Sequence, residues 1–295
     1  MKLSKTSRRP LLQYLQIFEN EIRALKFRIK WKLGLIKKAT DKYISERELT
    51  FEDDFNNNEL DRNKWNTTFD WGRHDFNNLT WTTDGKNLEF SNSILRIFAK
   101  SEPGTKTGWW GTINYEFTIG SINTCRKFEQ TYGRFECKAK LDNHPALWPA
   151  FWTLTVGHTH PDAPNNHERI MPEIDIMEGT GNGGWSKKYK KSSMSLHYGL
   201  SYEELWHKSD GTATKGINYN NNYYIFAVEW KKDRLEWFIN NEKVKVLRFK
   251  YLESEEIPIR PMYLILGESV NLERGRKYKD SLPAGLWIDW VRAYK

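Results

Sequence analysis

Apolar residues near the start of the chain recur at alternating spacings of four and three. The positions of this heptad seam are Leu11, Leu15, Phe18, Ile22, Leu25, Ile29, Lys32 and Ile36. Seven of these eight seam positions are apolar, a pattern that predicts one amphipathic helix of about three and a half repeats. Pro10 suits a first helical turn, and Ser7 is a candidate cap next to it.

The pattern changes after Thr50, where short runs of aromatic and β-branched residues alternate with polar ones. The clearest runs cover residues 93–100, 132–141, 173–178, 193–199, 223–230, 234–239 and 286–294. Asn240 and Asn241 separate two of these strands and fit a two-residue hairpin turn. Many short strands spaced by turns predict an all-β sandwich or jelly roll, preceded by the helix.

The chain therefore divides into a basic helical segment, residues 1–46, and a β-rich segment, residues 47–295. Three interpretations of the helix compete. A short coiled coil would self-associate through residues 11–36, and a basic amphipathic helix would lie on an anionic membrane. The third interpretation is a helix packed against the body of its own domain.

The net charge of +8 would fit a nucleic-acid-binding protein, but its distribution argues against one. Residues 1–47 carry 13 Lys or Arg and 4 Asp or Glu, a net +9, which leaves −1 for the rest. No nucleic-acid partner is expected for the β-rich body. The 14 Trp, 14 Tyr and 15 Phe fit an aromatic core or a surface that stacks on flat ligands such as sugar rings.

Targeting and redox signals are sparse. No signal peptide and no run of about 18 apolar residues is visible, so no transmembrane helix is expected. Cys125 and Cys137 lack metal-ligand spacing. Two reduced thiols are the simpler interpretation, and a disulfide would need the two residues to face each other across a hairpin.

Three acids lie within six positions of the stretch MPEIDIMEGTG: Glu173, Asp175 and Glu178. In a regular strand Glu173 and Asp175 share one face, whereas Glu178 points to the other. One extra residue, a β-bulge at Ile176 or Met177, would bring all three carboxyl groups to the same face. The competing interpretation is a regular strand with an ordinary solvated acidic face.

Hydrolysis of a glycosidic bond needs two carboxyl groups, one as nucleophile or base and one as proton donor. Glu173 and Glu178 fit this pair, and Asp175 between them would orient a glutamate and help to keep the donor protonated. Trp148 and Trp152 share one strand face by parity and could stack on sugar rings, although two such tryptophans are also ordinary core residues.

The ordered set of motifs resembles glycoside hydrolase family 16 over most of residues 51–295. The matching stretches are FEDDFNNNELDRNKW (51–65), YGRFECKAKL (132–141), LWPAFWTL (147–154), EIDIME (173–178), YYIFAVEWKKDRLEWFINNEKV (223–244) and LWIDWVRAY (286–294). EIDIME matches the bulged pattern Glu-x-Asp-x-x-Glu of that family. The resemblance implies a concanavalin-like jelly roll of two curved antiparallel sheets with a sugar cleft on the concave face.

The resemblance also implies roles for individual residues. Glu173 would be the nucleophile of a retaining mechanism, Asp175 the assisting acid and Glu178 the general acid/base. Trp148 matches a cleft tryptophan, and His197 matches a histidine that reaches toward the cleft, or else a hydrogen-bonded structural histidine. Trp230 and Trp237 are expected in the core. No cofactor is required, but Asp289 matches a position that holds a structural Ca²⁺ in some members.

These features favour an endo-acting hydrolase of β-1,3- or mixed β-1,3/1,4-glucan, because WPAFW and EIDIMEG resemble that group most closely. The stretch YLILGESVNLE (263–273) differs from the Gly-rich run of glucan-cleaving members. A hydrolase of galactans such as agar, carrageenan or porphyran and a transglycosylase are the alternatives. A non-catalytic carbohydrate-binding module has no need for the three acids. A polysaccharide substrate implies an extracellular protein, or one displayed on a cell or virion surface through the basic helix.

Overall fold

The computed structural model describes residues 5–39, 42, 44, 46–69, 80–108, 111–142, 144–156, 171–179, 191–199, 207–209, 214–215, 219–252 and 260–295. Its helices are α1 (Lys5–Lys32) and α2 (Leu272–Lys277), with 3₁₀ turns at η3 (Phe249–Tyr251) and η4 (Lys279–Ser281). Its strands are β1 (Leu49–Asp53), β2 (Thr80–Thr82), β3 (Leu88–Ser91), β4 (Ile94–Gly108), β5 (Gly111–Ile119), β6 (Ser121–Asn123), β7 (Gly133–Leu141), β8 (Ala150–Thr155), β9 (Met171–Glu178), β10 (Lys191–Gly199), β11 (His207–Ser209), β12 (Thr214–Lys215), β13 (Tyr224–Trp230), β14 (Arg234–Ile239), β15 (Glu242–Arg248), β16 (Met262–Gly267) and β17 (Ala284–Tyr294).

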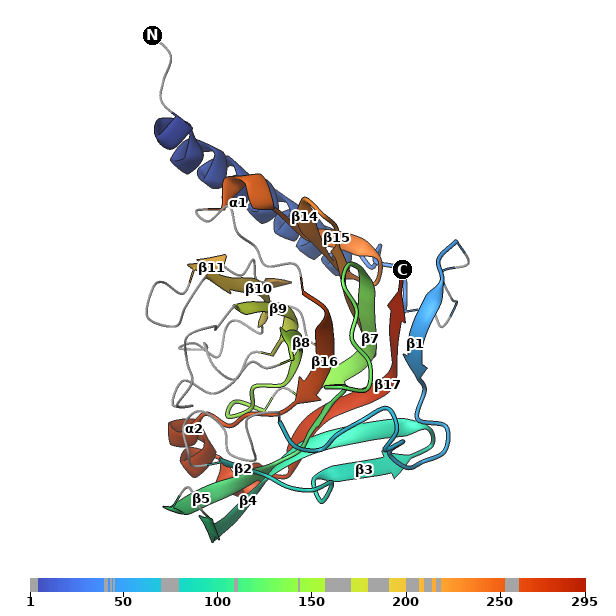
Figure 1. Cartoon of the computed structure of the whole chain (residues 1–295), viewed down its shortest axis with the longest axis vertical. Helices are drawn as coiled ribbons and strands as arrows, with labels where there is room; N and C mark the ends of the chain where they lie inside the picture. Colours follow the sequence, from blue (N-terminus) through green and yellow to red (C-terminus); the bar gives the residue numbers. More distant parts are fainter. Residues whose placement is uncertain are drawn as a thin grey trace.

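The strands form two sheets, as the sequence predicts for a jelly roll (Figure 1). The larger sheet has the order β15-β14-β13-β7-β17-β4-β5-β2, with β1 paired to β17 and β3 to β4. The smaller sheet has the order β11-β10-β9-β8-β16-β6, with β12 paired to β10. Strand pairing in the described residues is antiparallel except between β2 and β5, which run parallel and so depart from the expected purely antiparallel sheets.

The core lies between the two sheets. Alternate residues of β7, β13 and β17 in the larger sheet pack against Ile174 and Ile176 of β9 and Leu196 of β10 in the smaller one. Trp230 and Trp237 are fully buried in this core, as predicted. The turn between β14 and β15 also follows the prediction, since Asn240 and Asn241 both have positive φ angles, which two-residue hairpin turns require.

The predicted N-terminal helix is present, but it begins at Lys5, before Pro10. It runs along the edge strand β15 and its N-terminal end projects past the rest of the molecule (Figure 1). No helix in the described part of the chain is long and apolar enough to cross a membrane.

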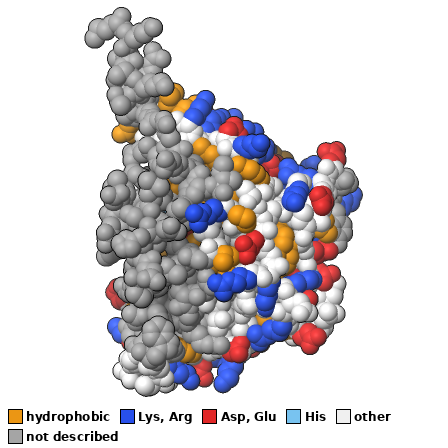
Figure 2. Space-filling view, in the orientation of Figure 1, with side chains coloured by type: hydrophobic (Ala, Val, Ile, Leu, Met, Phe, Trp, Pro, Cys, Tyr) orange, Lys and Arg blue, Asp and Glu red, His pale blue; other side chains and the backbone are white. Residues whose placement is uncertain are grey.

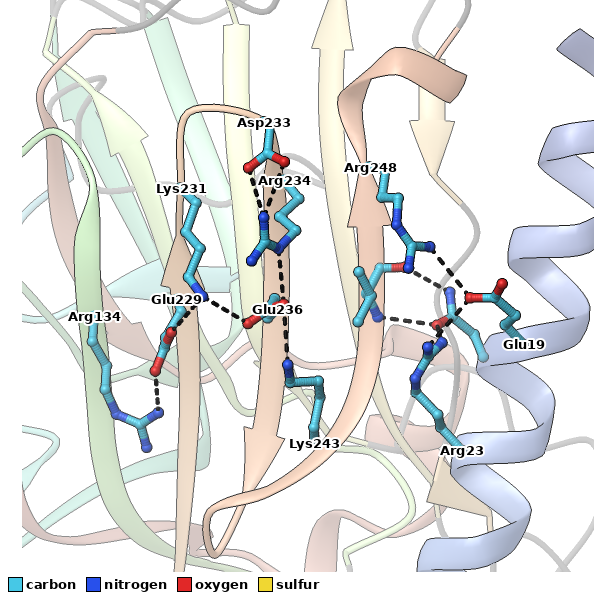
Figure 3. Close-up of polar contacts among 12 residues, drawn as sticks. Glu19, Arg23, Arg134, Glu229, Lys231, Asp233, Arg234, Glu236, Lys243 and Arg248 are labelled. Atoms are coloured by element: carbon cyan, nitrogen blue, oxygen red, sulfur yellow. Dashed lines mark hydrogen bonds and ion pairs between the residues drawn. The ribbon is translucent and has the colours of Figure 1, made fainter.

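Ion pairs join neighbouring strands across the outer surface of the larger sheet (Figure 3). Glu236 on β14 accepts hydrogen bonds from Arg234 and Lys231 and forms an ion pair with Lys243 on β15. Burial alone would raise the pKa of the Glu236 carboxyl, but these three cations outweigh it and lower the pKa to about 2. The carboxylate therefore stays charged in the folded protein well below its ordinary pKa of 4.5.

Cys125 and Cys137 are both buried, and no disulfide joins them. They do not face each other across a hairpin, because Cys125 follows β6 of the smaller sheet and Cys137 lies on β7 of the larger one. Burial raises the pKa of the Cys137 thiol well above its ordinary value. This arrangement agrees with the interpretation of two reduced thiols.

Candidate active site

The strand that carries the three acids contains the predicted β-bulge. Asp175 pairs with Trp152 of β8 and Met177 pairs with the adjacent Phe151, so Ile176 is an extra residue on β9. The pairing with β10 shows the same irregularity, since Ser195 lies opposite Asp175 and Ser193 opposite Glu178. The insertion lies at the Ile176–Met177 step, where the sequence predicts it.

The bulge changes which way the side chains point. Ile176 and Met177 are consecutive, yet both are fully buried and belong to the same core between the sheets. Glu178 therefore points to the same side of the sheet as Asp175, and both contact Ser195 there. The regular-strand interpretation, in which Glu178 would lie on the far face, is wrong.

Shared partners link the three carboxyl groups. His197 Nε2 lies 3.6 Å from Oε1 of Glu173 and 3.2 Å from Oδ2 of Asp175. The Ser195 hydroxyl lies 2.5 Å from the same Asp175 oxygen and 3.1 Å from Oε2 of Glu178. A continuous chain of polar contacts thus runs from Glu173 through His197, Asp175 and Ser195 to Glu178.

Glu178 is also held from the β8 side of the sheet. Trp148, which precedes β8, donates its indole N–H to Oε1 of Glu178 at 3.1 Å. The backbone fixes this approach, because the N–H of Gly179 bonds to the carbonyl of Pro149 at 2.6 Å. A Cβ on Gly179 would lie 2.4 Å from Cγ of the Pro149 ring, so only glycine fits here without a shift.

The larger sheet supports the acid-bearing strand β9 from the core side. Trp237 on β14 donates its indole N–H to the backbone carbonyl of Asp175 at 2.9 Å. Lys245 on β15 is almost fully buried, lies over the Trp237 ring and donates to the carbonyl of Met194 on β10 at 2.7 Å. These contacts attach β9, which carries the acids, and its neighbour β10 to the larger sheet.

Trp152, the other predicted stacking residue, lies on the face that carries the acids. It is directly opposite Asp175 in the β8–β9 pair, and cross-strand neighbours share a face. The side chain is half-buried and packs against a cluster formed by Cys125, Leu154, Tyr263 and Ile265. Trp152 is therefore at once a packing residue and part of the surface next to the acids.

Ser193, Ser195 and Trp237 belong to the site but were not among the predicted residues. Ser193, Ser195 and His197 follow each other at spacings of two on β10, so parity alone places them on one face. That spacing was the available signal for the serines. The contact of Trp237 joins two sheets and has no local signal in the sequence.

Asp289, the position at which the family resemblance implies a structural Ca²⁺ in some members, forms an ion pair with Lys138, whose ammonium group lies 2.6 Å from its carboxylate. The one group of acids and histidines in the described residues with metal-binding spacing consists of Glu173, Asp175 and His197. The polar stretch GHTHPDAPNNHERIMP (157–172), which leads into the acidic strand, lies outside the described residues except for its last two positions.

The comparisons with known proteins agree with this fold. A family model described as beta-porphyranase A–D, GH16 domain, matches residues 47–295. The chain belongs to glycoside hydrolase family 16, as its motifs predict.

Individual relatives are distant. The chain is 27% identical to glucan endo-1,3-beta-glucosidase A1 of Niallia circulans over 87% of its own length and 39% of that protein. It is also 27% identical to a beta-glucanase of Rhodothermus marinus, over 84% of this chain and 85% of the relative. Among solved structures, the catalytic domain of an endo-1,3-beta-glucanase (laminarinase) from Thermotoga petrophila is 26% identical, with a TM-score of 0.66 over 84% of this chain and 98% of that domain. The chain thus spans well under half of the Niallia relative.

Proposed function

We propose that the protein is an endo-acting, retaining glycoside hydrolase in which Glu173 and Glu178 carry out the reaction. The observation that carries this proposal is the bulge on β9, which brings both glutamates and Asp175 to one face within a single network of polar contacts. Hydrolysis with retention requires two carboxyl groups that flank the scissile bond, and a shared strand face allows Glu173 and Glu178 to do so.

The roles proposed for the two glutamates are those that the family resemblance implies. Glu178 donates its proton to the glycosidic oxygen while the carboxylate of Glu173 attacks the anomeric carbon and the bond to the leaving sugar breaks. Glu178, now a carboxylate, then takes a proton from water, whose oxygen displaces Glu173 and releases the second product. The second step returns to Glu178 the proton that it gave up in the first, so the proposed reaction requires no cofactor.

Asp175, His197 and Ser195 act as positioning residues in this proposal. Asp175 is almost fully buried, and its carboxylate contacts both His197 and Ser195, which in turn contact Glu173 and Glu178. A fixed network of this kind restricts the rotamers of the two glutamates and limits the reorganisation needed during the reaction.

The proposed substrate is a β-1,3- or mixed β-1,3/1,4-glucan. The Niallia and Rhodothermus relatives are named for such activities, and Trp148 and Trp152 supply flat apolar surfaces beside the acids on which pyranose rings can stack. A galactan of the agar, carrageenan or porphyran type is the second candidate, because the matching family model is described as a beta-porphyranase domain. Transglycosylation, in which a sugar hydroxyl replaces water, is the third.

We also propose a division of labour along the chain. Residues 47–295 would form the catalytic domain, and residues 1–46 a segment whose positions 11–36 make contacts outside the catalytic site, either with a second copy or with a membrane surface. A polysaccharide substrate places the working protein outside the cell or on a cell or virion surface.

A panel of polysaccharides tests the substrate proposal. The full chain should release reducing ends from laminarin or lichenan faster than from agarose, carrageenan or porphyran. Faster release from a galactan would replace the glucan by the second candidate and leave the mechanism intact. Products longer than the supplied oligosaccharide would identify a transglycosylase.

The stereochemistry of the first product tests the mechanism. NMR spectra taken early in the reaction should show the β-anomer at the new reducing end, because two displacements restore the original configuration. An α-anomer appearing first would mean inversion and would contradict a nucleophilic Glu173.

A further inference from the structure

Helix α1 is attached to the body through side-chain amides. The Asn20 side chain donates to the carbonyl of Val246 at 2.8 Å and accepts from its N–H at 3.0 Å. Gln16 accepts from the N–H of Arg248 at 2.7 Å. Gln16 and Asn20 are buried, as are Ala24 and Phe27 further along the same face. The face of α1 toward the sheet is therefore largely polar where it meets β15.

The apolar seam of α1 lies on the opposite face. Each seam residue from Phe18 to Ile29 is two positions from one of these four buried residues. Leu11 and Leu15 are each two positions from Gln13, whose side chain donates to the carbonyl of Tyr251 on the body. Two residues are slightly more than half a helical turn. The exposed fractions along this stripe are Leu11 62%, Leu15 49%, Phe18 64%, Ile22 37%, Leu25 48% and Ile29 49%. A continuous row of exposed large apolar side chains on a folded helix indicates a contact surface.

Basic residues border this stripe toward its C-terminal half. Lys26 follows Leu25 and Arg28 precedes Ile29, so they lie on either side of the stripe. Lys32 continues the seam itself and is exposed. The two acids of the helix are Glu19 and Glu21, and Glu19 is turned toward Arg248 on the body, where it forms an ion pair (Figure 3). Figure 2 shows hydrophobic and basic side chains side by side along the edge where α1 runs.

We infer that the stripe on α1 lies on an anionic lipid bilayer, with the β-sandwich held above it by the amide-bonded face. An apolar face bordered by Lys and Arg is the pattern of helices that lie in the membrane interface. The membrane is thus the partner proposed for residues 11–36, in place of a second copy. This holds whichever polysaccharide the protein cleaves.

The charges favour a membrane over a second copy. Pairing two stripes would bring together two segments that each carry a net +9 over residues 1–47. It would also bury Lys32, which occupies a seam position, against the partner helix. On an anionic surface the same charges are attractive, and Lys32 can extend its ammonium group to the lipid headgroups.

Sedimentation with vesicles tests the inference on the full chain. The protein should sediment with phosphatidylcholine vesicles containing about one third phosphatidylglycerol, and at least about tenfold less with phosphatidylcholine alone. Added salt should weaken the binding. The double variant Phe18→Ser/Ile22→Ser should lower the affinity at least about tenfold, because it removes two central apolar side chains from the stripe.

Leu49→Ser is the matched control, since Leu49 is an exposed leucine (39%) on β1 and not on the helix. Both variants change exposed side chains and should retain the wild-type circular dichroism spectrum and the wild-type hydrolysis of a soluble polysaccharide. Equal binding to both vesicle types, or unchanged binding of the double variant, would overturn the inference. So would a dimer in sedimentation velocity that the double variant abolishes without any vesicle binding.

Discussion

The indole of Trp148 and the hydroxyls of two serines hold Glu178 from two sides. Trp148 donates to Oε1, while Ser193 and Ser195 contact Oε2 at 3.4 and 3.1 Å. Glu178 as a whole residue is only 8% exposed, and its carboxyl group lies on the face that the bulge gives it. Its orientation therefore depends on a few individual atoms.

Removing one of these atoms should slow the reaction while sparing the fold. Trp148→Phe keeps an aromatic surface but deletes the indole N–H, so kcat should fall about tenfold with little change in KM. Trp287→Phe is the matched control, because the buried indole N–H of Trp287 has no hydrogen-bond partner among the described residues. Steady-state kinetics on the preferred polysaccharide make the comparison. Equal losses in both variants would deny Trp148 a positioning role.

At the scale of elements, helix α1 covers the exposed edge of strand β15 in the larger sheet. Edge strands expose backbone N–H and C=O groups that would otherwise pair with other chains. Asn20 satisfies both groups of Val246, and Gln16 satisfies the N–H of Arg248, so side-chain amides take the place of a neighbouring strand. The helix thus stabilises β15 without offering it an apolar face there.

Asn20→Ala should destabilise the protein by about 1–3 kcal/mol, because it leaves the N–H and C=O of Val246 without partners at a buried site. Chemical denaturation measures the free energy of unfolding. Glu21→Ala, an exposed position next in sequence, should change it by less than about 0.5 kcal/mol. Similar effects of the two substitutions would mean that the edge does not depend on the amide.

The sequence predicts the bulge of β9 and the apolar seam of α1, but it leaves open which way that seam faces. The bulge is predictable because Glu178 has the wrong parity to share a strand face with Glu173 and Asp175. The three acids can act together only if one extra residue is inserted between Asp175 and Glu178. The seam of α1 is also visible, but its direction is not. A row of leucines and isoleucines normally faces the core, whereas Gln16 and Asn20 look like solvent-facing residues until β15 is placed beside them. Contacts between distant segments, such as Trp237 with Asp175, leave no local pattern.

At the scale of the whole molecule, the two sheets have different tasks. The smaller sheet carries the acids on one face, and the larger one supports it through Trp237 and Lys245. The outer surface of the larger sheet is crossed by ion pairs that centre on Glu229 and Glu236, and a separate ion pair joins Arg248 on β15 to Glu19 on α1 (Figure 3). Stability and chemistry are thus concentrated on different surfaces.

The ion pairs of Glu236 should make the free energy of unfolding depend on pH in the acid range. Because the pKa of Glu236 is lowered to about 2 from 4.5, its contribution is fully present above 4.5 and is lost as the pH falls toward 2. Glu236→Gln should cost about 1.5–3 kcal/mol at neutral pH, and its difference from wild type should shrink on acidification. Denaturation curves at a series of pH values measure this. A difference that stays constant or grows below 4.5 would contradict the assignment.

The catalytic roles of Glu173 and Glu178 are tested by the rate at which the Glu173→Gln and Glu178→Gln variants cleave polysaccharide. Each substitution replaces a carboxyl group by an amide of the same shape, so the circular dichroism spectrum and melting temperature should stay close to wild type. Each should lower kcat by at least about 100-fold on the polysaccharide that the wild-type protein cleaves. Glu242→Gln, on the remote strand β15, should retain the wild-type rate. A folded Glu173→Gln or Glu178→Gln protein with the wild-type rate would contradict the account of a bulged catalytic strand.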